Sequence, residues 1–296
     1  MIRILVTVFA ALLGLAFGSF LNVCLSRWPE GESVVKPRSH CRICERTLAW
    51  WENVPLLSWL ALRGRCRGCQ TWISVRYPLV EAAVGVLWAS VGWHFTTQLM
   101  NDRFAVDLRY SVLIPAIETA IGMAIFYFLM VGLAVLDAEH LWLPDAVTIP
   151  GIVAGFLYSI LLICQSRRYG TGQPLIWQAI GERLLAIVVA AAIVLLIRWV
   201  YWLIRRHEGM GLGDAKLMAL LAAWLGLPST LLAFGLGVLM GAVVGLVFIA
   251  LPSARRAESN WAMIKLPLGT FLCIGGIISG LWGPQIISAY LTWVGL

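Results

Sequence analysis

"LLAFGLGVLMGAVVGLVFIAL", at residues 231–251, is a run of 21 residues without a single charged side chain. As an α-helix it would be about 30 Å long, which is enough to cross the hydrocarbon core of a bilayer. Apolar stretches of similar length recur along almost the whole chain. The sequence therefore predicts an all-α polytopic membrane protein with about eight transmembrane helices, at residues 4–24, 79–97, 112–136, 146–165, 183–204, 216–229, 231–251 and 268–293.

The composition supports this class. The chain has 296 residues, of which 60% are hydrophobic and 12% are charged, and its mean hydropathy is +0.86. These values exclude an ordinary soluble domain. The first run is too long for a secretory signal peptide and lacks a clear cleavage site, so we expect it to remain as a membrane anchor. The short sixth run is separated from the seventh at GLPST, residues 226–230.

One polar segment interrupts the apolar pattern. Residues 25–78, here called the cysteine module, contain nine Lys or Arg residues and four of the seven cysteines. The sequence thus predicts three parts: a first transmembrane helix at 1–24, the cysteine module at 25–78, and a transmembrane domain at 79–296. The cysteine module is expected to lie outside the lipid.

The distribution of basic residues predicts the orientation, because short loops rich in Lys and Arg remain in the cytoplasm. Fifteen Lys and Arg residues fall on the side of the cysteine module, against six on the other side, Arg183 among them. The module is therefore expected in the cytoplasm. The net charge of +7 indicates topology and contact with anionic membrane lipids, and it does not imply nucleic acid.

The cysteine module carries two C-x-x-C pairs, CRIC at 41–44 and CRGC at 66–69. Four thiolates at this spacing can close a tetrahedral structural Zn²⁺ site with Cys41, Cys44, Cys66 and Cys69 as its ligands. Two incidental reduced thiol pairs and a redox role are the alternatives. The remaining cysteines, Cys24, Cys164 and Cys273, are expected to be small core residues.

Two carboxylates lie at the cytoplasmic ends of predicted spans. Asp137 ends the third span and Asp214 opens the sixth, so both are expected at a similar depth. Two close carboxylates cannot both ionise easily, and such a pair suits peptide hydrolysis, with one as the base for water and the other as a hydrogen-bond donor. The helix dipole predicts that Asp137, at a helix C-terminus, holds the shared proton more often.

Other residues near Asp214 are candidates for support of the site. Gly209, Gly211 and Gly213 would let an extended peptide approach the acid, with helix packing as the alternative. Asp145 is expected to cap the fourth span or to support the catalytic pair. Lys216 is expected to point away from Asp214 toward lipid phosphates.

These motifs together resemble the bacterial type IV prepilin leader peptidases, which are also N-methyltransferases. The resemblance covers nearly the whole chain and is carried by GSFLNVCLSRWP at 18–29, by the cysteine module, by LDAEHLWLPD at 136–145 and by GMGLGDAKLMALLAAWLG at 209–226. The sequence also departs from the family pattern at KLPLGT, residues 265–270, and at Ala222 and Ala223. Neither departure is expected to touch the aspartates.

The resemblance implies a function and site residues. Asp137 and Asp214 would be the catalytic aspartates, and the four module cysteines would bind zinc in a module linked to methyl transfer. The family acts in the bacterial inner membrane, with its active site on the cytoplasmic side. It cleaves basic leaders from type IV prepilins and type II secretion pseudopilins just after a glycine, and then methylates the new N-terminus with S-adenosylmethionine. The sequence defines neither the methyl-donor site nor the oligomeric state.

Two other classes of protein remain open at this point. A secondary transporter could use paired membrane carboxylates as proton or ion sites, although these acids fall at one edge of the membrane rather than at its midplane. A noncatalytic membrane scaffold could dock partners on the cysteine module, but it would leave Asp137 and Asp214 unexplained.

Overall fold

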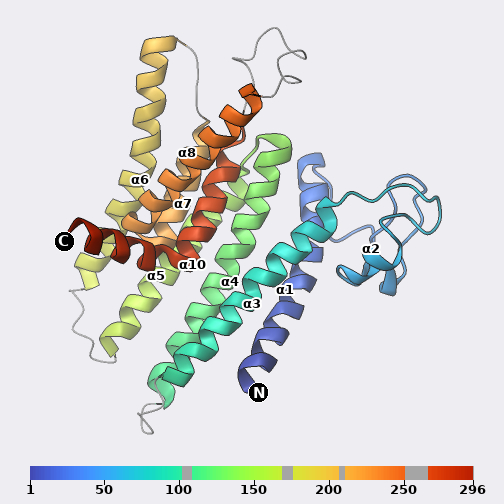
Figure 1. Cartoon of the computed structure of the whole chain (residues 1–296), viewed down its shortest axis with the longest axis horizontal. Helices are drawn as coiled ribbons and strands as arrows, with labels where there is room; N and C mark the ends of the chain where they lie inside the picture. The colour runs from blue at the N-terminus through green and yellow to red at the C-terminus, as the bar shows by residue number, and fades with distance from the viewer. Residues whose placement is uncertain (102–108, 169–175, 207–210, 251–265, 296) are drawn as a thin grey trace. The chain divides into compact units, whose positions relative to one another are not determined.

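The structure, a computed structural model, describes residues 1–101, 109–168, 176–206, 211–250 and 266–295 (Figure 1). The chain divides into two compact units, Met1–Gly132 and Leu133–Leu296, and the division falls within a long helix, α4. The three-part division at residues 24 and 78 therefore differs from the division by contacts, and it remains a prediction. Each unit is described by itself below.

All regular elements among the described residues are helices, and their only β-pairing is two isolated β-bridges in the cysteine module, so the predicted all-α class is confirmed. A helix lies at each of the eight predicted spans, and seven are long and apolar enough to cross a membrane among the described residues. The eight helices are α1 (Ile2–Arg27), α3 (Arg76–Asn101), α4 (Arg109–His140), α5 (Asp145–Arg168), α6 (Ile176–Arg205), α7 (Leu212–Leu225), α8 (Leu227–Ala250) and α10 (Leu268–Val294). The cysteine module adds short helices: η1 (Trp28–Glu30), η2 (Trp50–Asn53) and α2 (Leu57–Ala61).

The one helix of these eight that is not long enough to cross a membrane, α7, is short and enclosed by other helices. Its 14 residues give a length of about 21 Å, which is less than the hydrocarbon thickness. Ten of these residues are buried, and α7 contacts α5, α6, α8 and α10. The break from α8 comes at Gly226, earlier than the sequence indicates, because Gly226 takes a φ of +78° that ends the helix.

The C-terminal end of α7 is held by a half-buried arginine. Arg183 donates from Nη1 to the carbonyl oxygen of Ala222 over 3.2 Å. The topology prediction counts Arg183 as a loop residue, but the structure places it inside α6. A cation here satisfies a carbonyl group at the helix end and opposes the negative end of the helix dipole. The side-chain nitrogen of Trp224 also donates to the carbonyl of Gly151, which ties α7 to α5.

In the first unit, α1 and α3 pack closely through glycines. A Cβ atom on Gly14 would lie 2.8 Å from the Val84 carbonyl oxygen, and one on Gly18 would lie 2.8 Å from Glu81 Cα. Small residues of this kind allow two membrane helices to approach backbone to backbone. This contact fixes the ends of α1 and α3, between which the chain forms the cysteine module.

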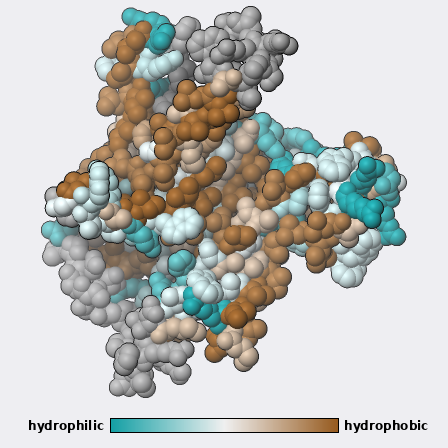
Figure 2. All heavy atoms as spheres, viewed as in Figure 1, coloured by the Kyte–Doolittle hydropathy of each residue, from teal (hydrophilic) through white to brown (hydrophobic). Residues whose placement is uncertain are grey.

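Large apolar side chains are exposed along the membrane helices, as expected where lipid covers them. Figure 2 shows hydrophobic residues over much of the visible face, and hydrophilic residues gather on part of the cysteine module. Of the three cysteines outside the module, Cys24 and Cys273 are buried as predicted. The prediction was wrong for Cys164, which lies on an exposed face of α5.

Candidate active site and metal site

Asp137 lies in the last turn of α4 and is 6% exposed. Its Oδ2 atom accepts a hydrogen bond from the backbone N–H of Thr270 over 2.6 Å, and the Thr270 hydroxyl oxygen lies 3.1 Å from the same atom. Thr270 is the third residue of α10, so the carboxylate meets the N-terminal end of that helix. Gly269 makes this approach possible, because a Cβ atom there would lie 2.8 Å from Asp137 Cγ.

This arrangement corrects one expectation from the sequence. The segment KLPLGT departs from the family pattern and was expected not to touch the aspartates, yet its last two residues surround the Asp137 carboxylate. The N-terminus of α10 favours a negative charge on Asp137, which opposes the effect of the C-terminus of α4 on the same carboxylate. The assignment of the shared proton to Asp137 remains a prediction with a weaker physical basis.

Asp214 lies in the first turn of α7 and is 8% exposed. Its Oδ2 accepts a hydrogen bond from the backbone N–H of Gly211 over 3.3 Å. The Asp214 carboxylate is close enough to the Asp137 carboxylate for the two to interact electrostatically. Both carboxylates also interact electrostatically with the buried thiol of Cys273. The structure therefore brings together the two acids that the sequence singled out, Asp137 against the N-terminus of α10 and Asp214 in the first turn of α7.

The three glycines near Asp214 have separate positions. Gly211 is the residue that precedes α7 and donates to Asp214. Gly213 packs against a hydrophobic side chain, because a Cβ atom there would lie 3.2 Å from Leu143 Cβ. Gly209 lies outside the described residues. The role of these glycines in admitting a peptide remains a prediction.

Asp145 and Lys216 form an ion pair next to the aspartates. Lys216 Nζ donates to Asp145 Oδ1, and this contact joins α7 to the first residue of α5. The prediction that Lys216 reaches toward lipid phosphates was wrong, because its ammonium group is paired within the protein. The contact places Asp145 beside the segment that carries Asp214, where a supporting role stays a prediction. Both side chains are more than one third exposed, so the pair contributes little to stability.

The four module cysteines form one cluster that could hold a metal ion. Their sulfur atoms all lie within 4.8 Å of one another. Cys41 Sγ is 3.8 Å from Cys69 Sγ, and Cys44 Sγ is 4.0 Å from Cys66 Sγ. A tetrahedral zinc site with Zn–S bonds of 2.3 Å has S···S edges of about 3.8 Å. These two distances are thus close to the edges of a tetrahedral metal site.

The two C-x-x-C segments fold alike, which the sequence analysis missed. In the first, the Cys41 N–H donates to the Arg46 carbonyl and Glu45 has a φ of +55°. In the second, the Cys66 N–H donates to the Thr71 carbonyl and Gln70 has a φ of +58°. An isolated β-bridge brackets each turn, His40 to Thr47 and Arg65 to Trp72. The same offsets within HCRICERT and RCRGCQTW were the available signal.

The second turn also prepares a thiol for metal binding. Backbone N–H groups of Cys69 and Gly68 point at the sulfur of Cys66 and lower the pKa of this thiol to about 6. A thiolate is the form that binds a metal ion. The turn therefore offers a sulfur ligand that is charged near neutral pH.

An ion pair between a partly exposed arginine and a buried glutamate lies in the cysteine module. Arg46 Nη2 donates to Glu52 Oε1 over 2.6 Å, and Glu52 Oε2 accepts from the Ala49 N–H over 2.8 Å. The Glu52 side chain is fully buried, and the hydrogen bond from Arg46 lowers the pKa of the Glu52 carboxyl group. The loop between the two C-x-x-C pairs is thus fixed around one satisfied carboxylate.

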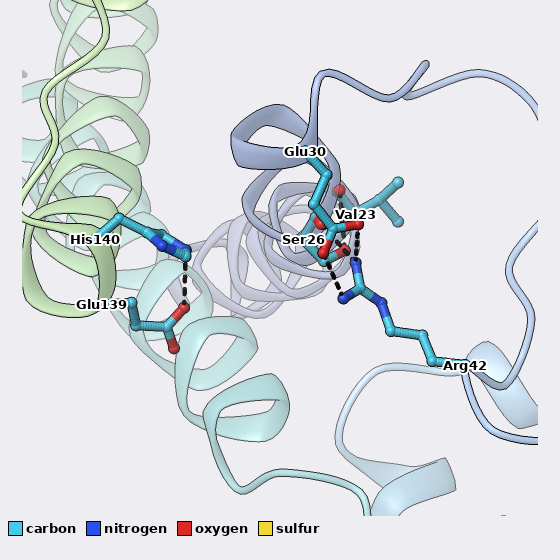
Figure 3. Close-up of polar contacts among 6 residues, drawn as sticks. All are labelled: Val23, Ser26, Glu30, Arg42, Glu139 and His140. Atoms are coloured by element: carbon cyan, nitrogen blue, oxygen red, sulfur yellow. Dashed lines mark hydrogen bonds and ion pairs between the residues drawn. The ribbon is translucent and has the colours of Figure 1, made fainter.

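A cavity of about 910 Å³ lies in the first unit, between the ends of α1 and α3 and the cysteine module. Arginine and aromatic side chains line its wall, and Asn22 and Glu81 line it from the two helices. Figure 3 shows one wall contact: the guanidinium group of Arg42 reaches the Glu30 carboxylate and the Ser26 carbonyl at the end of α1. The sequence analysis missed this cavity, because residues far apart in the sequence form it.

The end of α4 carries a further polar pair in the second unit. Figure 3 also shows Glu139, two residues after Asp137, beside the adjacent His140; Glu139 Oε2 lies 3.9 Å from His140 Nε2. Both side chains are partly exposed. The pair places a carboxylate and an imidazole at the end of α4.

The fold and the site together define a class of protein. A multi-pass membrane protein with two buried, interacting aspartates at helix ends has the features of a membrane aspartic protease. Comparison with known families agrees. Residues 123–246 match the "Type IV leader peptidase family", and residues 12–95 match the "Bacterial Peptidase A24 N-terminal domain". The chain belongs to the type IV leader peptidase family, as the resemblance in its motifs implied.

Curated relatives support this assignment along the chain. A protein of Stutzerimonas stutzeri is 33% identical over 97% of this chain and 94% of its own length. A protein of Pseudomonas putida is 32% identical over 97% of this chain and 94% of its own length. One of Myxococcus xanthus is 36% identical over 83% of this chain and 64% of its own length. All three are called prepilin leader peptidase/N-methyltransferase. No solved structure matches the chain. Nothing in these comparisons favours a transporter or a scaffold.

Proposed function

We propose that this chain removes the leader peptide of type IV prepilins and type II secretion pseudopilins, and then methylates the new N-terminal amino group with S-adenosylmethionine. The observation that carries the peptidase activity is the pair of buried carboxylates, Asp137 and Asp214, which come from different helices and interact electrostatically. The family and its relatives support both activities.

The two aspartates divide the work of hydrolysis. One carboxylate is ionised and takes a proton from a water molecule, which then attacks the scissile carbonyl carbon. The other is protonated and donates a hydrogen bond to the carbonyl oxygen, where negative charge develops. Collapse of the tetrahedral intermediate breaks the C–N bond, and the leaving nitrogen receives a proton from the acidic member. The base has by then gained a proton from water, so the pair ends the reaction with one proton and one negative charge, as it began.

The site is expected at the cytoplasmic edge of the bacterial inner membrane. The excess of basic residues on the side of the cysteine module supports this orientation. Leaders of type IV prepilins are basic, and Glu139 lies two residues beyond Asp137, where its carboxylate can attract them. The exposed apolar faces of the helices contact membrane lipids.

The four sulfur atoms of the cysteine module hold a zinc ion. Two of the S···S distances are close to the edges of a tetrahedral site, and backbone N–H donors favour the thiolate of Cys66. Zinc, when bound, supplies a crosslink between the two C-x-x-C turns. With four sulfur ligands no position remains for water, so the metal is structural.

The cavity of the first unit is the methyl-donor site. Its volume suits a ligand of this size. S-adenosylmethionine, when bound, supplies an electrophilic methyl group. The side chains present fit its parts, since Arg38 and Arg67 can bind a carboxylate and Trp59 can stack on an adenine ring. The cysteine module is thereby linked to methyl transfer.

Cleavage of a prepilin peptide by the purified, zinc-loaded protein tests the peptidase site. Asp137→Asn and Asp214→Asn should each lower kcat by about 100-fold to 10,000-fold, because each removes one member of the acid–base pair. Glu182→Gln is the control, since this carboxylate is exposed on α6 and has no predicted role in the site. Cleavage at the wild-type rate by either catalytic variant would contradict the mechanism.

Methyl transfer is measured separately on a peptide that has already been cleaved. Both aspartate variants should transfer a labelled methyl group to this peptide, because the cavity lies in the other unit. Wild-type protein that cleaves the peptide and never labels it would leave only the peptidase half of the proposal.

A further inference from the structure

We infer that Asn22 and Glu81 form a subsite for a primary ammonium group at the membrane end of the cavity. This inference rests on the proposed methyl-donor site. Two ammonium groups could enter: the new N-terminus of the cleaved peptide and the amino group of the methyl donor itself. Both would present the same chemistry to the protein, a cation with three N–H donors.

Asn22 supplies a buried acceptor for which the described part of the chain offers no donor. The side chain is 2% exposed, and its Nδ2 atom donates to the Tyr77 carbonyl oxygen over 2.9 Å. This bond fixes the orientation of the amide, because a flipped side chain would set two oxygen atoms against each other. The Oδ1 atom is buried and has no hydrogen-bond partner among the described residues, although it belongs to a residue that lines the cavity.

Glu81 supplies a carboxylate in the adjacent turn. The residue is 8% exposed, its Oε2 accepts from the Leu56 N–H over 2.8 Å, and the Ser19 hydroxyl interacts with the carboxylate. A carboxylate has room for about four hydrogen bonds, so these two leave capacity for a ligand. Glu81 follows Tyr77 by one helical turn on α3, and Asn22 follows Ser19 by nearly one turn on α1. The two acceptors therefore come from neighbouring turns of the contact between α1 and α3, and both residues line the cavity.

The surrounding charges explain why a cation is needed from outside. Three of the arginines in the wall are held by other groups: Arg27 donates to the carbonyls of Ser33 and Pro37, Arg42 pairs with Glu30, and Arg46 pairs with Glu52. A buried acceptor and a buried carboxylate cost free energy unless donors reach them. A primary ammonium group fills this need, since it can donate to Asn22 Oδ1 and to the Glu81 carboxylate together.

The subsite also gives Glu81 a chemical role if the peptide N-terminus is the occupant. An ammonium group has no lone pair and cannot accept a methyl group. Transfer of one proton from the ammonium nitrogen to the Glu81 carboxylate leaves a neutral amine with a free lone pair and a neutral carboxylic acid. Asn22 Oδ1 accepts a hydrogen bond from one of the two remaining N–H groups and thereby orients the lone pair of the amine nitrogen. The proton on Glu81 then passes to water.

The test uses the full-length, zinc-loaded protein and the variant Glu81→Gln, which keeps the size of the side chain and removes its charge. The probes are S-adenosylhomocysteine, which carries the donor's ammonium group, and 5′-methylthioadenosine, which lacks it. Methylation of a cleaved peptide is followed over pH. Glu182→Gln is the control, because this carboxylate is exposed on α6 in the other unit. Zinc content and melting temperature report whether each variant is folded.

The two sources of ammonium give different results. If the peptide is the occupant, Glu81→Gln should lower kcat/KM for the peptide at least 10-fold and change the pH profile, while both probes bind as in wild type. If the donor is the occupant, S-adenosylhomocysteine should bind about 10-fold more weakly and 5′-methylthioadenosine unchanged. Glu81→Asp, which restores a carboxylate, should recover part of either loss.

Other outcomes would overturn the inference. If the Glu81→Gln variant keeps the wild-type methylation rate, pH profile and binding of both probes, no ammonium group binds there. Asn22 and Glu81 would then accept hydrogen bonds from water only. If the Glu81→Gln variant binds both probes equally more weakly and also loses its zinc, Glu81 has only a structural role. Failure of the proposed methyl-donor site looks different, because wild-type protein itself would then bind neither probe.

Discussion

Thr270 contacts the Asp137 carboxylate through both its backbone and its side chain, with the N–H 2.6 Å and the hydroxyl oxygen 3.1 Å from Oδ2. The same hydroxyl oxygen lies 3.0 Å from the carbonyl of Ala134. A hydroxyl group has one hydrogen and two acceptor positions. It can donate to an ionised Asp137, or donate to Ala134 and accept a hydrogen bond from a protonated Asp137. Thr270 thus satisfies either state of the acid that the peptidase cycle requires.

Thr270→Val should therefore slow peptide cleavage. The variant keeps the backbone N–H and the shape of the side chain but loses the hydroxyl. A hydrogen bond to a charged group contributes about 1.5–3 kcal/mol, so kcat should fall by about 10- to 100-fold with little change in KM. Thr270→Ser, which restores the hydroxyl, should recover most of the rate. Equal rates for the valine variant and wild type would show that the hydroxyl is dispensable.

Gly269→Ala should displace the Asp137 carboxylate. The added Cβ would lie 2.8 Å from Asp137 Cγ and 2.9 Å from Oδ2, closer than such atoms approach. A shift of about 1 Å in a catalytic group can cost about 100-fold in rate. Gly235→Ala on α8 is the control, because its Cβ would meet no atom within 4 Å. We expect a large loss of cleavage in the first variant and none in the second; matching losses would point to general disturbance of the helices.

Removal of the metal should unfold the cysteine module and leave the second unit folded. Metal binding to a four-cysteine site stabilises small modules by about 10–16 kcal/mol, and the two C-x-x-C turns have little other secondary structure. Cys66→Ser should give the same result as a chelator, whereas Cys164→Ser should keep the metal, because Cys164 lies outside the cluster. Hydrogen exchange across residues 38–75 and across α5 to α8 measures the outcome. A protected, metal-free module in the wild-type chain would refute the assignment.

Arg183→Met should lower the melting temperature in detergent. Its guanidinium group donates to the Ala222 carbonyl at the end of α7, and its loss would leave that carbonyl buried without this partner. The cost should be about 1.5–3 kcal/mol. Arg183→Lys should recover part of the loss, since an ammonium group can still oppose the helix dipole. An unchanged melting temperature in the methionine variant would mean that other groups hold the end of α7.

The sequence predicted the helices and the two aspartates because both leave local signals. Apolar runs of membrane length mark α1 and α8, and a carboxylate beside such a run is unusual enough to identify Asp214. The spacing of the four cysteines was sufficient to predict a metal site. Hydrophobicity alone did not show that α7 is enclosed by four neighbouring helices, because a helix surrounded by protein and a helix surrounded by lipid have similar apolar sequences.

The polar contacts around the sites were not predictable in the same way. Thr270 is 133 residues from Asp137, and Asn22 is 55 residues from Tyr77. Such pairs depend on which helices become neighbours. A departure from a family pattern was visible at KLPLGT, yet only the packing of α10 against the end of α4 brought it to the acid. Lys216 was misplaced for the same reason, since its partner Asp145 is 71 residues away.

The distance along the chain between Asp137 and Thr270 has a consequence for biosynthesis. A ribosome makes Asp137 long before it makes the donors that this carboxylate requires, and Asp214 also precedes α10. A nascent chain that has inserted both acids into the membrane still lacks the residues that hold Asp137 in place. The peptidase therefore matures only after the last of these helices has been inserted, so unfinished chains should not cleave their neighbours.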